Sequence, residues 1–204
     1  DARQQAASQG EMIDQAIDLG VDGIIVQLGL AETLKGPIDR AIAKGIKVVA
    51  FDVDLNSPQV TQVEQDHHAL ARLALDQAVK DNGTRFDAGY VYISGFTPME
   101  RRDEIWSQVK QANPGIIEKA RFGTLNPPIA NSVADQASAV LRANPDISVI
   151  FAPFDEFAKG AKIAVDEAGL GRKVKIYSAD ISTADIQIMK EPDSAWAATA
   201  AVNP

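Results

Sequence analysis

Short apolar runs alternate with helix-like segments along the whole chain, and this alternation restricts the fold more than any single motif does. Near-continuous apolar runs lie at 24–28, 48–51, 90–93, 148–152 and 174–179. Their length and composition are typical of strands that are buried on both faces. Strands that alternate with helices form parallel sheets with helices on both faces, so we predict an α/β fold.

The expected elements follow from the spacing of apolar residues and from the turn residues between them. Gly20 and Gly45 are expected to end the first two helices, and Pro37 to lie near the first turn of the second. After the turn residues 56–59, residues 60–63 alternate as an extended connector, which we interpret as a crossover between lobes. We expect helices at 5–19, 32–44, 70–80, 100–112, 129–142, 156–168 and 183–190, and strands at 24–28, 48–51, 90–93, 117–122, 148–152, 174–179 and 196–202.

Charge and composition exclude several classes of function. The 204 residues include 20 lysines and arginines against 28 aspartates and glutamates, which gives a net charge of -8. This balance opposes binding to nucleic acid or to an anionic membrane surface. Because the chain has no cysteine and only two histidines, we expect no disulfide, no thiol nucleophile, no zinc site and no cofactor.

Targeting and nucleotide-binding motifs are also missing from the sequence. No apolar run approaches the roughly 18 residues needed to cross a bilayer. The first residues lack the apolar stretch of a signal peptide, so we expect that segment to be absent from this chain. Neither of the common glycine-rich phosphate-binding motifs occurs, which argues against nucleotide binding through such loops.

Three aspartates follow apolar strands at the edge of the predicted sheets. Asp52 comes directly after 48–51, Asp54 follows two residues later, and Asp180 comes directly after 174–179. Ligands of open parallel sheets bind beyond the carboxyl ends of the strands, where the loops separate. We therefore predict ligand-binding carboxylates here, with turn capping as the alternative for Asp52 and Asp54. Ser182 is available to cap the next helix, which leaves Asp180 for a ligand.

Three further side chains are candidates for the same ligand. Arg102 is expected in the first turn of a helix, where a cation opposes the helix dipole, so binding or a surface ion pair must explain it. Phe154 lies in a loop before a helix that Asp155 is expected to cap, with burial in the core as the alternative. His67, at the start of a helix, is the weakest candidate, because a histidine there is commonly solvated or hydrogen-bonded.

Carboxylates, a guanidinium and an aromatic ring together suit a polyhydroxylated ligand. A carboxylate accepts hydroxyl hydrogen bonds, a guanidinium donates several in a fixed fork, and an aromatic face covers the C–H side of a sugar or polyol. Opposite charges in one cleft also limit the free energy lost by burying either of them.

Seven short segments have the order and spacing of one known family: GVDGIIV at 20–26, AKGIKVVAFD at 43–52, QDH at 65–67, RRDE at 101–104, NPD at 144–146, FAPFDE at 151–156 and YSAD at 177–180. In these segments the chain resembles the periplasmic sugar-binding proteins of bacterial ABC importers, in their ribose-binding-like branch. The resemblance implies a two-lobed type I periplasmic-binding-protein fold with the sugar held between α/β lobes. It places Asp52, Arg102 and Asp180 at positions where the family binds its ligand.

The resemblance also implies domain boundaries. Residues 1–64 correspond to a partial N-terminal lobe, 65–202 to the C-terminal lobe and 203–204 to the start of a crossover back. The family's opening strand-helix-strand unit has no counterpart in the chain, so the resemblance implies that the chain is incomplete. Phe154 and His67 stand where the family often has asparagine, which leaves open a differently shaped polyol or a modified sugar.

The function implied by the resemblance is binding without chemistry. We expect a monomeric, periplasmic solute-binding protein that captures a sugar or polyol by hinge closure and delivers it to an ABC permease. One alternative is the effector-binding domain of a LacI-type regulator, which shares the fold. The other is an enzyme, a phosphohydrolase of the haloacid dehalogenase type, whose D-x-D motif is matched by Asp52 and Asp54, although Asn56 stands where that motif has threonine.

Overall fold

The computed structural model describes residues 2–202, and the chain divides into two compact units. Unit 1 consists of Asp1–Asp66 and Ser94–Glu100, and unit 2 consists of His67–Ile93 and Arg101–Pro204. Each unit has its own parallel sheet and its own apolar core.

From the sequence we predict lobes at 1–64 and 65–202. The chain passes from unit 1 to unit 2 after residue 66, and 94–100 returns to unit 1. That return was not anticipated from the sequence. The expected crossover at 203–204 lies outside the described residues.

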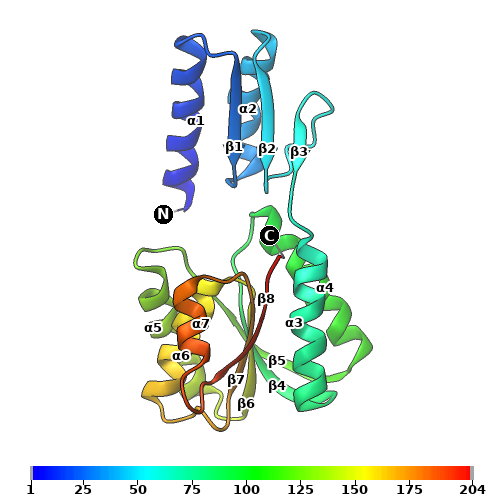
Figure 1. The fold of residues 1–204 in the computed structure, drawn as a ribbon, viewed down its shortest axis with the longest axis vertical. Coiled ribbons are helices and arrows are strands. Elements are labelled where there is room, and N and C mark those ends of the chain that lie inside the picture. The colour runs from blue at the N-terminus through cyan, green and yellow to red at the C-terminus, as the bar shows by residue number, and fades with distance from the viewer. Residues whose placement is uncertain (1, 203–204) are drawn as a thin grey trace. The chain divides into compact units, whose positions relative to one another are not determined.

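Unit 1 is a three-stranded parallel sheet with two helices (Figure 1). Its elements are α1 (Ala2–Asp18), β1 (Gly23–Gln27), α2 (Ala31–Ala43), β2 (Lys47–Phe51) and β3 (Thr61–Val63), and the strand order is β1-β2-β3. Leu34, Ile38 and Ala41 lie on one stripe of α2 and are buried in the core of this unit. Gly20 and Gly45 follow the two helices with φ of 71° and 81°, a conformation that glycine adopts without a steric penalty.

Unit 2 is a five-stranded parallel sheet in the order β5-β4-β6-β7-β8. In Figure 1, α3 and α4 lie on one side of this sheet, and α5, α6 and α7 lie on the other. The elements are α3 (His67–Asn82), β4 (Arg85–Val91), α4 (Thr97–Ala112), β5 (Gly115–Phe122), α5 (Ile129–Ala143), β6 (Ile147–Ala152), α6 (Asp155–Glu167), β7 (Lys175–Ala179), α7 (Thr183–Met189) and β8 (Trp196–Ala200).

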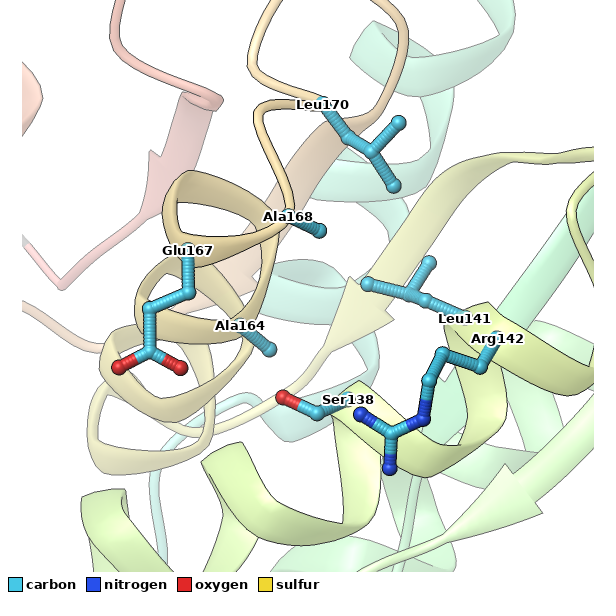
Figure 2. A pocket seen from close by; sticks show the side chains of 7 residues that line it. All are labelled: Ser138, Leu141, Arg142, Ala164, Glu167, Ala168 and Leu170. Carbon is cyan, nitrogen blue, oxygen red and sulfur yellow. The ribbon is translucent and has the colours of Figure 1, made fainter.

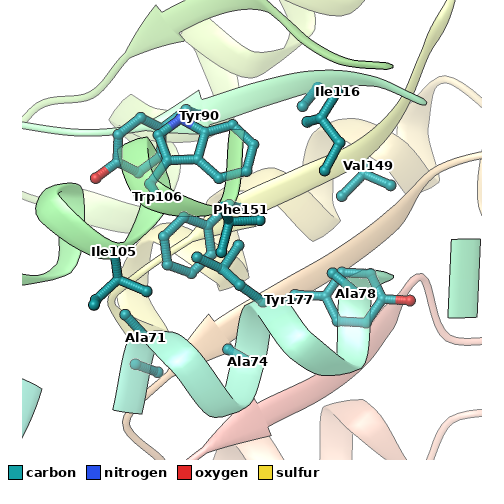
Figure 3. Packing of buried hydrophobic residues seen from close by; sticks show 14 of the residues in the cluster. Ala71, Ala74, Ala78, Tyr90, Ile105, Trp106, Ile116, Val149, Phe151 and Tyr177 are labelled. Atoms are coloured by element: carbon teal, nitrogen blue, oxygen red, sulfur yellow. The ribbon is translucent and has the colours of Figure 1, made fainter. Parts of the chain in front are cut away.

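Aromatic rings form the centre of the unit 2 core on the α3 and α4 side of the sheet. Tyr90 stacks on Phe151 with a centroid distance of 5.4 Å, and Trp106 lies 5.5 Å from Tyr90 and 5.8 Å from Phe151. Figure 3 shows Ala71, Ala74 and Ala78 of α3 beside these rings. Small residues on α3 let the helix approach the sheet closely, and the large rings fill the space between them.

The structure confirms the α/β class, the parallel sheets and the type of each expected element, and it corrects three positions. Pro37 lies inside α2, which begins at Ala31, because the buried stripe of α2 already starts at Leu34. Similarly, α4 begins at Thr97, so Arg102 lies in the second turn of the helix.

The third correction concerns the cap of α6. Phe154 occupies the N-cap position, and Asp155 is the first helical residue. A carboxylate in the first turn still interacts favourably with the helix dipole. By contrast, the expected capping role of Ser182 is confirmed, since it forms a reciprocal capping box with Asp185 at the start of α7.

The extended connector at 60–63 is also a strand. Its residues 61–63 pair with β2 in parallel as β3. Across residues 2–202, no helix has both the length and the apolar character needed to cross a membrane.

Candidate functional site

Asp180 stands at the carboxyl end of β7, as the sequence predicts. Its backbone adopts a φ of 73°, and its N–H donates to the carbonyl oxygen of Ala200 at 2.8 Å. Thr199 Oγ1 donates to the Asp180 carbonyl oxygen at 2.6 Å. The turn is thus tied to β8 at both of its backbone groups, and the side chain remains 28% exposed.

Arg102 of α4 binds the Asp180 carboxylate with both terminal nitrogens. The distances are 2.8 Å from Nη1 to Oδ2 and 3.0 Å from Nη2 to Oδ1. Nη1 also donates to the carbonyl oxygen of Pro153, and Nη2 lies 3.2 Å from Nδ1 of His67. Two-pronged binding of a carboxylate by a guanidinium is among the strongest polar contacts in proteins.

The guanidinium of Arg102 is buried, with 2% of the residue exposed. Four of its five N–H groups are used in these contacts, and Nε has no partner among the described residues. The alternative of a surface ion pair is therefore wrong for Arg102. That role falls to Arg101, whose Nη1 lies 3.8 Å from Glu104.

His67 begins α3, as predicted, but it is buried rather than solvated. Arginine has no hydrogen-bond acceptor, so the contact from Arg102 requires a lone pair on Nδ1 of His67. His67 thus supports the guanidinium that holds Asp180.

Phe154 is half-buried at the N-cap of α6. Its ring meets Phe157 edge-on, with a centroid distance of 5.2 Å and an interplanar angle of 79°. Arg102 bonds to the preceding residue, Pro153, and so ties the loop of Phe154 to the loop of Asp180. Arg102, Asp180 and His67 are in direct contact, and Phe154 is linked to them through one carbonyl group.

In unit 1, Asp52 stands at the end of β2 with a φ of 54° and is 4% exposed. Its Oδ1 accepts the backbone N–H of Gln65 at 3.1 Å, and its Oδ2 accepts Nε2 of Gln65 at 3.4 Å. The backbone N–H of Asp52 donates to Val63 of β3 at 2.9 Å.

Asp54 is exposed and takes part in a local turn. Its Oδ1 accepts the backbone N–H of Asn56 at 2.9 Å, and its own N–H donates to Oγ1 of Thr97 at 2.9 Å. The first contact is the turn-capping alternative given for this residue. Its predicted part in ligand binding stays a prediction.

Sequence reasoning missed two parts of the unit 2 site. One is the carbonyl oxygen of Pro153, which no side-chain pattern reveals. The other is a charged cluster in which Lys159 of α6 lies 3.0 Å from the buried carboxylate of Asp185 in α7. The spacing of Ser182 and Asp185 was a signal for this second feature, because it matches a capping box.

A groove between α5 and α6 contains none of the predicted site residues. It has a volume of about 420 Å³ and is lined by Ser138, Leu141, Arg142, Ala164, Glu167, Ala168 and Leu170. Figure 2 shows side chains from the two helices facing each other across it. These residues lie toward the C-terminal ends of their helices, whereas ligands of such sheets bind beyond the strand ends, near helix N-termini.

Within residues 2–202, no group of three or more histidine, aspartate or glutamate side chains is arranged to hold a metal ion. The polar side chains at the strand ends are hydrogen-bond donors and acceptors held in fixed positions. In each unit, the predicted part of these side chains in ligand binding stays a prediction.

Comparison with known proteins gives one matching family. Residues 1–204 match the family described as periplasmic binding protein domain. A curated relative, the D-ribose/D-allose-binding protein of Pseudomonas aeruginosa, is 27% identical over 183 residues, which are 85% of this chain and 56% of that protein.

Two solved structures are similar in both fold and sequence. The 5-methylthioribose transporter solute-binding protein of Thermotoga lettingae, in complex with 5-methylthioribose, gives a TM-score of 0.90 at 34% identity and covers 94% of this chain and 61% of that one. A sugar ABC transporter of Yersinia enterocolitica gives a TM-score of 0.86 at 33% identity, with coverage of 91% and 57%.

The chain thus spans roughly three fifths of the length of these relatives. The relatives are sugar-binding transport proteins, and neither the phosphohydrolase nor the transcriptional-regulator alternative is favoured by the matches. With residues 1–204 matched by one family description and with two parallel α/β units in the structure, the chain belongs to the periplasmic binding protein family.

Proposed function

We propose that this chain is the larger part of an extracytoplasmic solute-binding protein that captures a sugar or polyol for an ABC importer. The observation that carries the proposal is a carboxylate held at the end of a parallel strand in each unit, Asp52 in one and Asp180 in the other. A ligand whose hydroxyl groups donate hydrogen bonds to both carboxylates stabilises a closed arrangement over an open one, because only the closed arrangement makes both sets of contacts.

The proposed ligand contacts are of two kinds, hydrogen bonds and an apolar contact. Asp52 and Asp180 accept hydroxyl hydrogen bonds, and Arg102 fixes Asp180 and offers its Nε–H. Phe154 presents part of an apolar ring to the C–H face of the ligand or to an apolar substituent. His67 acts through Arg102, and Asp54 is the remaining candidate from the prediction.

The relatives narrow the choice of ligand. The curated relative is named for D-ribose and D-allose, and the 34% identical structure contains 5-methylthioribose. An apolar phenylalanine beside the Asp180 loop fits a sugar that carries an apolar substituent. We therefore propose 5-methylthioribose as the first compound to test, with ribose and allose beside it.

A thermal-shift screen of the full-length protein tests the proposal. A ligand at 100 times its dissociation constant adds about 2.7 kcal/mol to the free energy of unfolding, so a true ligand raises Tm clearly. Loss of a charged hydrogen bond costs about 1.5 to 3 kcal/mol, so Asp52→Ala and Asp180→Ala should each weaken binding at least tenfold.

Asp135→Ala is a matched control, since this aspartate is exposed on α5, and it should leave binding unchanged. If no sugar or polyol shifts Tm, the ligand class is wrong. If a ligand binds equally well to both aspartate variants, the proposed site is wrong. A fall in the radius of gyration on ligand addition, measured by solution scattering, would support closure.

A further inference from the structure

Leu28 has an unusual backbone conformation for a leucine. Its φ is 56°, in the left-handed region that residues with a Cβ rarely adopt. Within the described residues, the non-glycine positions with positive φ are Leu28, Asp52, Asn56, Asp180 and Asp193. Aspartate and asparagine tolerate this conformation because their short polar side chains bond to nearby backbone groups. Leucine has no such compensation, so contacts from elsewhere must hold Leu28 in this turn.

The contacts that hold Leu28 come from α1 and β2. Nε2 of Gln9 lies 3.1 Å from the carbonyl oxygen of Gln27 and 3.4 Å from that of Leu28, so one side-chain amide donates to two successive carbonyl groups. The N–H of Leu28 donates to the carbonyl oxygen of Phe51 at 2.9 Å. Both backbone polar groups of Leu28 are thus fixed.

Gly29 completes the turn. Its φ is 108°, and a Cβ there would overlap Oε1 of Gln9 and lie 2.8 Å from Cδ1 of Leu34. A side chain at position 29 would therefore push away the amide that binds the Leu28 carbonyl group. The sequence places glycine where the turn needs it, but leucine at the preceding position, where the turn disfavours it.

Packing in unit 1 does not explain this leucine. Leu28 is 40% exposed, and it belongs neither to the buried core of the unit nor to the partly buried residues that pack against it. Asparagine at this position would tolerate the left-handed backbone and would remove no core contact. Strained conformations that do not serve folding cluster at binding sites, where the surrounding structure holds them.

Leu28 stands at the edge of the sheet where ligands bind. β1 and β2 are parallel, and their last paired residues are Gln27 and Phe51. Leu28 and Asp52 directly follow this pair, with φ of 56° and 54°. Both therefore leave adjacent strands at the carboxyl edge of the sheet. Asp52 provides a hydrogen-bond acceptor at this edge, and Leu28 provides an exposed apolar surface.

We propose that Leu28 is a specificity-determining residue, which gives the ligand site of unit 1 an apolar surface that favours a sugar with an apolar substituent over the sugar with a hydroxyl group in its place. This inference deepens the proposed function and rests on it. A hydroxyl group that lies against leucine loses hydrogen bonds to water, whereas a methylthio group loses almost none. Phe154 is the corresponding apolar candidate of unit 2.

Calorimetric titration of the full-length protein with 5-methylthioribose and with D-ribose tests the inference. The measured quantity is the ratio of the two affinities, because general damage to the fold lowers both affinities together. Apolar contact equivalent to one methylene group changes such a ratio by roughly 10- to 200-fold. We expect Leu28→Asn to reduce the preference for 5-methylthioribose by about tenfold or more. Leu28→Met, which restores an apolar side chain of similar volume, should retain most of the preference.

Leu19→Asn is the matched control. Leu19 is 82% exposed and lies between the end of α1 and the amino end of β1, so this variant should keep the wild-type ratio. Urea unfolding followed by circular dichroism adds a measurement that needs no ligand. Leu28→Asn should unfold at the wild-type midpoint or above it, because asparagine tolerates the turn and no core contact is lost. A lower midpoint would show that the leucine serves folding, and it would overturn the inference.

The titration distinguishes a failure of this inference from a failure of the proposed function. If both sugars bind and Leu28→Asn leaves the ratio unchanged, or if the wild type prefers D-ribose, Leu28 does not set specificity and only the inference fails. If neither sugar binds to the wild type, the proposed function fails for these ligands, and the inference fails with it.

Discussion

Asp52 in unit 1 and Asp180 in unit 2 share one backbone arrangement but are held by different partners. Each directly follows a parallel strand, with φ of 54° and 73°. Each donates its backbone N–H to the adjacent strand, at 2.9 Å to Val63 and at 2.8 Å to Ala200. The left-handed turn ends the strand and directs a short carboxylate away from the sheet.

The partners of the two carboxylates differ in charge and in distance along the chain. Asp52 accepts from the amides of Gln65, which is 13 residues away on the connector that follows it. Asp180 is held by the guanidinium of Arg102, 78 residues away. Position is thus maintained locally in unit 1 and by tertiary packing in unit 2, so mutation should disturb unit 2 more.

Removal of the Arg102 guanidinium should have the largest effect, and it tests whether tertiary contacts hold Asp180 in place. Arg102→Met keeps most of the apolar stem but leaves Asp180, the Pro153 carbonyl and His67 Nδ1 without their donor. Loss of one partner of a buried ion pair costs about 3 kcal/mol or more. We expect the free energy of unfolding of unit 2 to fall by about that amount.

Both tryptophans of the chain, Trp106 and Trp196, are buried in unit 2. Their emission during urea unfolding therefore reports on unit 2. The control is Arg172→Ala, which removes a side chain that is 91% exposed and lies 3.7 Å from Asp193; its effect should stay within about 0.5 kcal/mol. If Arg102→Met unfolds at the wild-type midpoint, the guanidinium does not hold unit 2 together.

Glu118 of β5 is a second carboxylate in unit 2 that is held in place by cationic side chains. It therefore tests whether such partners stabilise this unit. It accepts hydrogen bonds from Trp106 at 2.6 Å, Lys110 at 2.5 Å and Arg121 at 2.8 Å. Burial acts to raise its pKa, but these hydrogen bonds prevail and lower the pKa from 4.5 to about 2. The resulting stabilisation is present above about pH 4.5 and is lost as pH falls toward 2.

We expect Glu118→Gln to lower the free energy of unfolding at pH 7 by about 1 to 3 kcal/mol, and by progressively less as pH falls below 4.5. Urea unfolding at pH 7 and at pH 3 measures this difference. Glu167→Gln, at an exposed position on α6, should change neither value. A Glu118→Gln effect of the same size at both pH values would show that packing, and not charge, explains the loss.

Most of the fold follows from local sequence patterns. Apolar periodicity predicts the helices and strands because burial of one helix stripe or of strand faces dominates most elements. β1 is an exception to the expected burial, because Ile25 is 78% exposed. The main error in extent is β4, which begins at Arg85 although only 90–93 was expected. Arg85 and Asp87 interrupt the apolar run, and Asp87 is accommodated by an ion pair with Lys119 of β5 at 3.2 Å.

The site was predictable only where it is local. A carboxylate after an apolar strand can be found from sequence, as Asp52 and Asp180 show. The burial of Arg102 cannot, because its partners are 51 and 78 residues distant and its helix begins earlier than the spacing suggests. The ion pair between Lys159 and Asp185 was missed for the same reason, since it depends on how α6 and α7 pack.

The smallest expected effect concerns Asp54, the predicted ligand residue whose carboxylate accepts a hydrogen bond within a local turn. Asp54→Ala removes the hydrogen bond to the Asn56 amide, at an exposed position where substitutions usually change stability by no more than about 0.5 kcal/mol. The Asn56 amide should exchange faster with deuterium, the tryptophan-monitored midpoint should stay at the wild-type value, and affinity for 5-methylthioribose should change less than twofold. A tenfold loss of affinity, of the kind expected for Asp52→Ala, would instead make Asp54 a second ligand carboxylate from unit 1, and the two units would then differ in the number of acceptors as well as in how those acceptors are held.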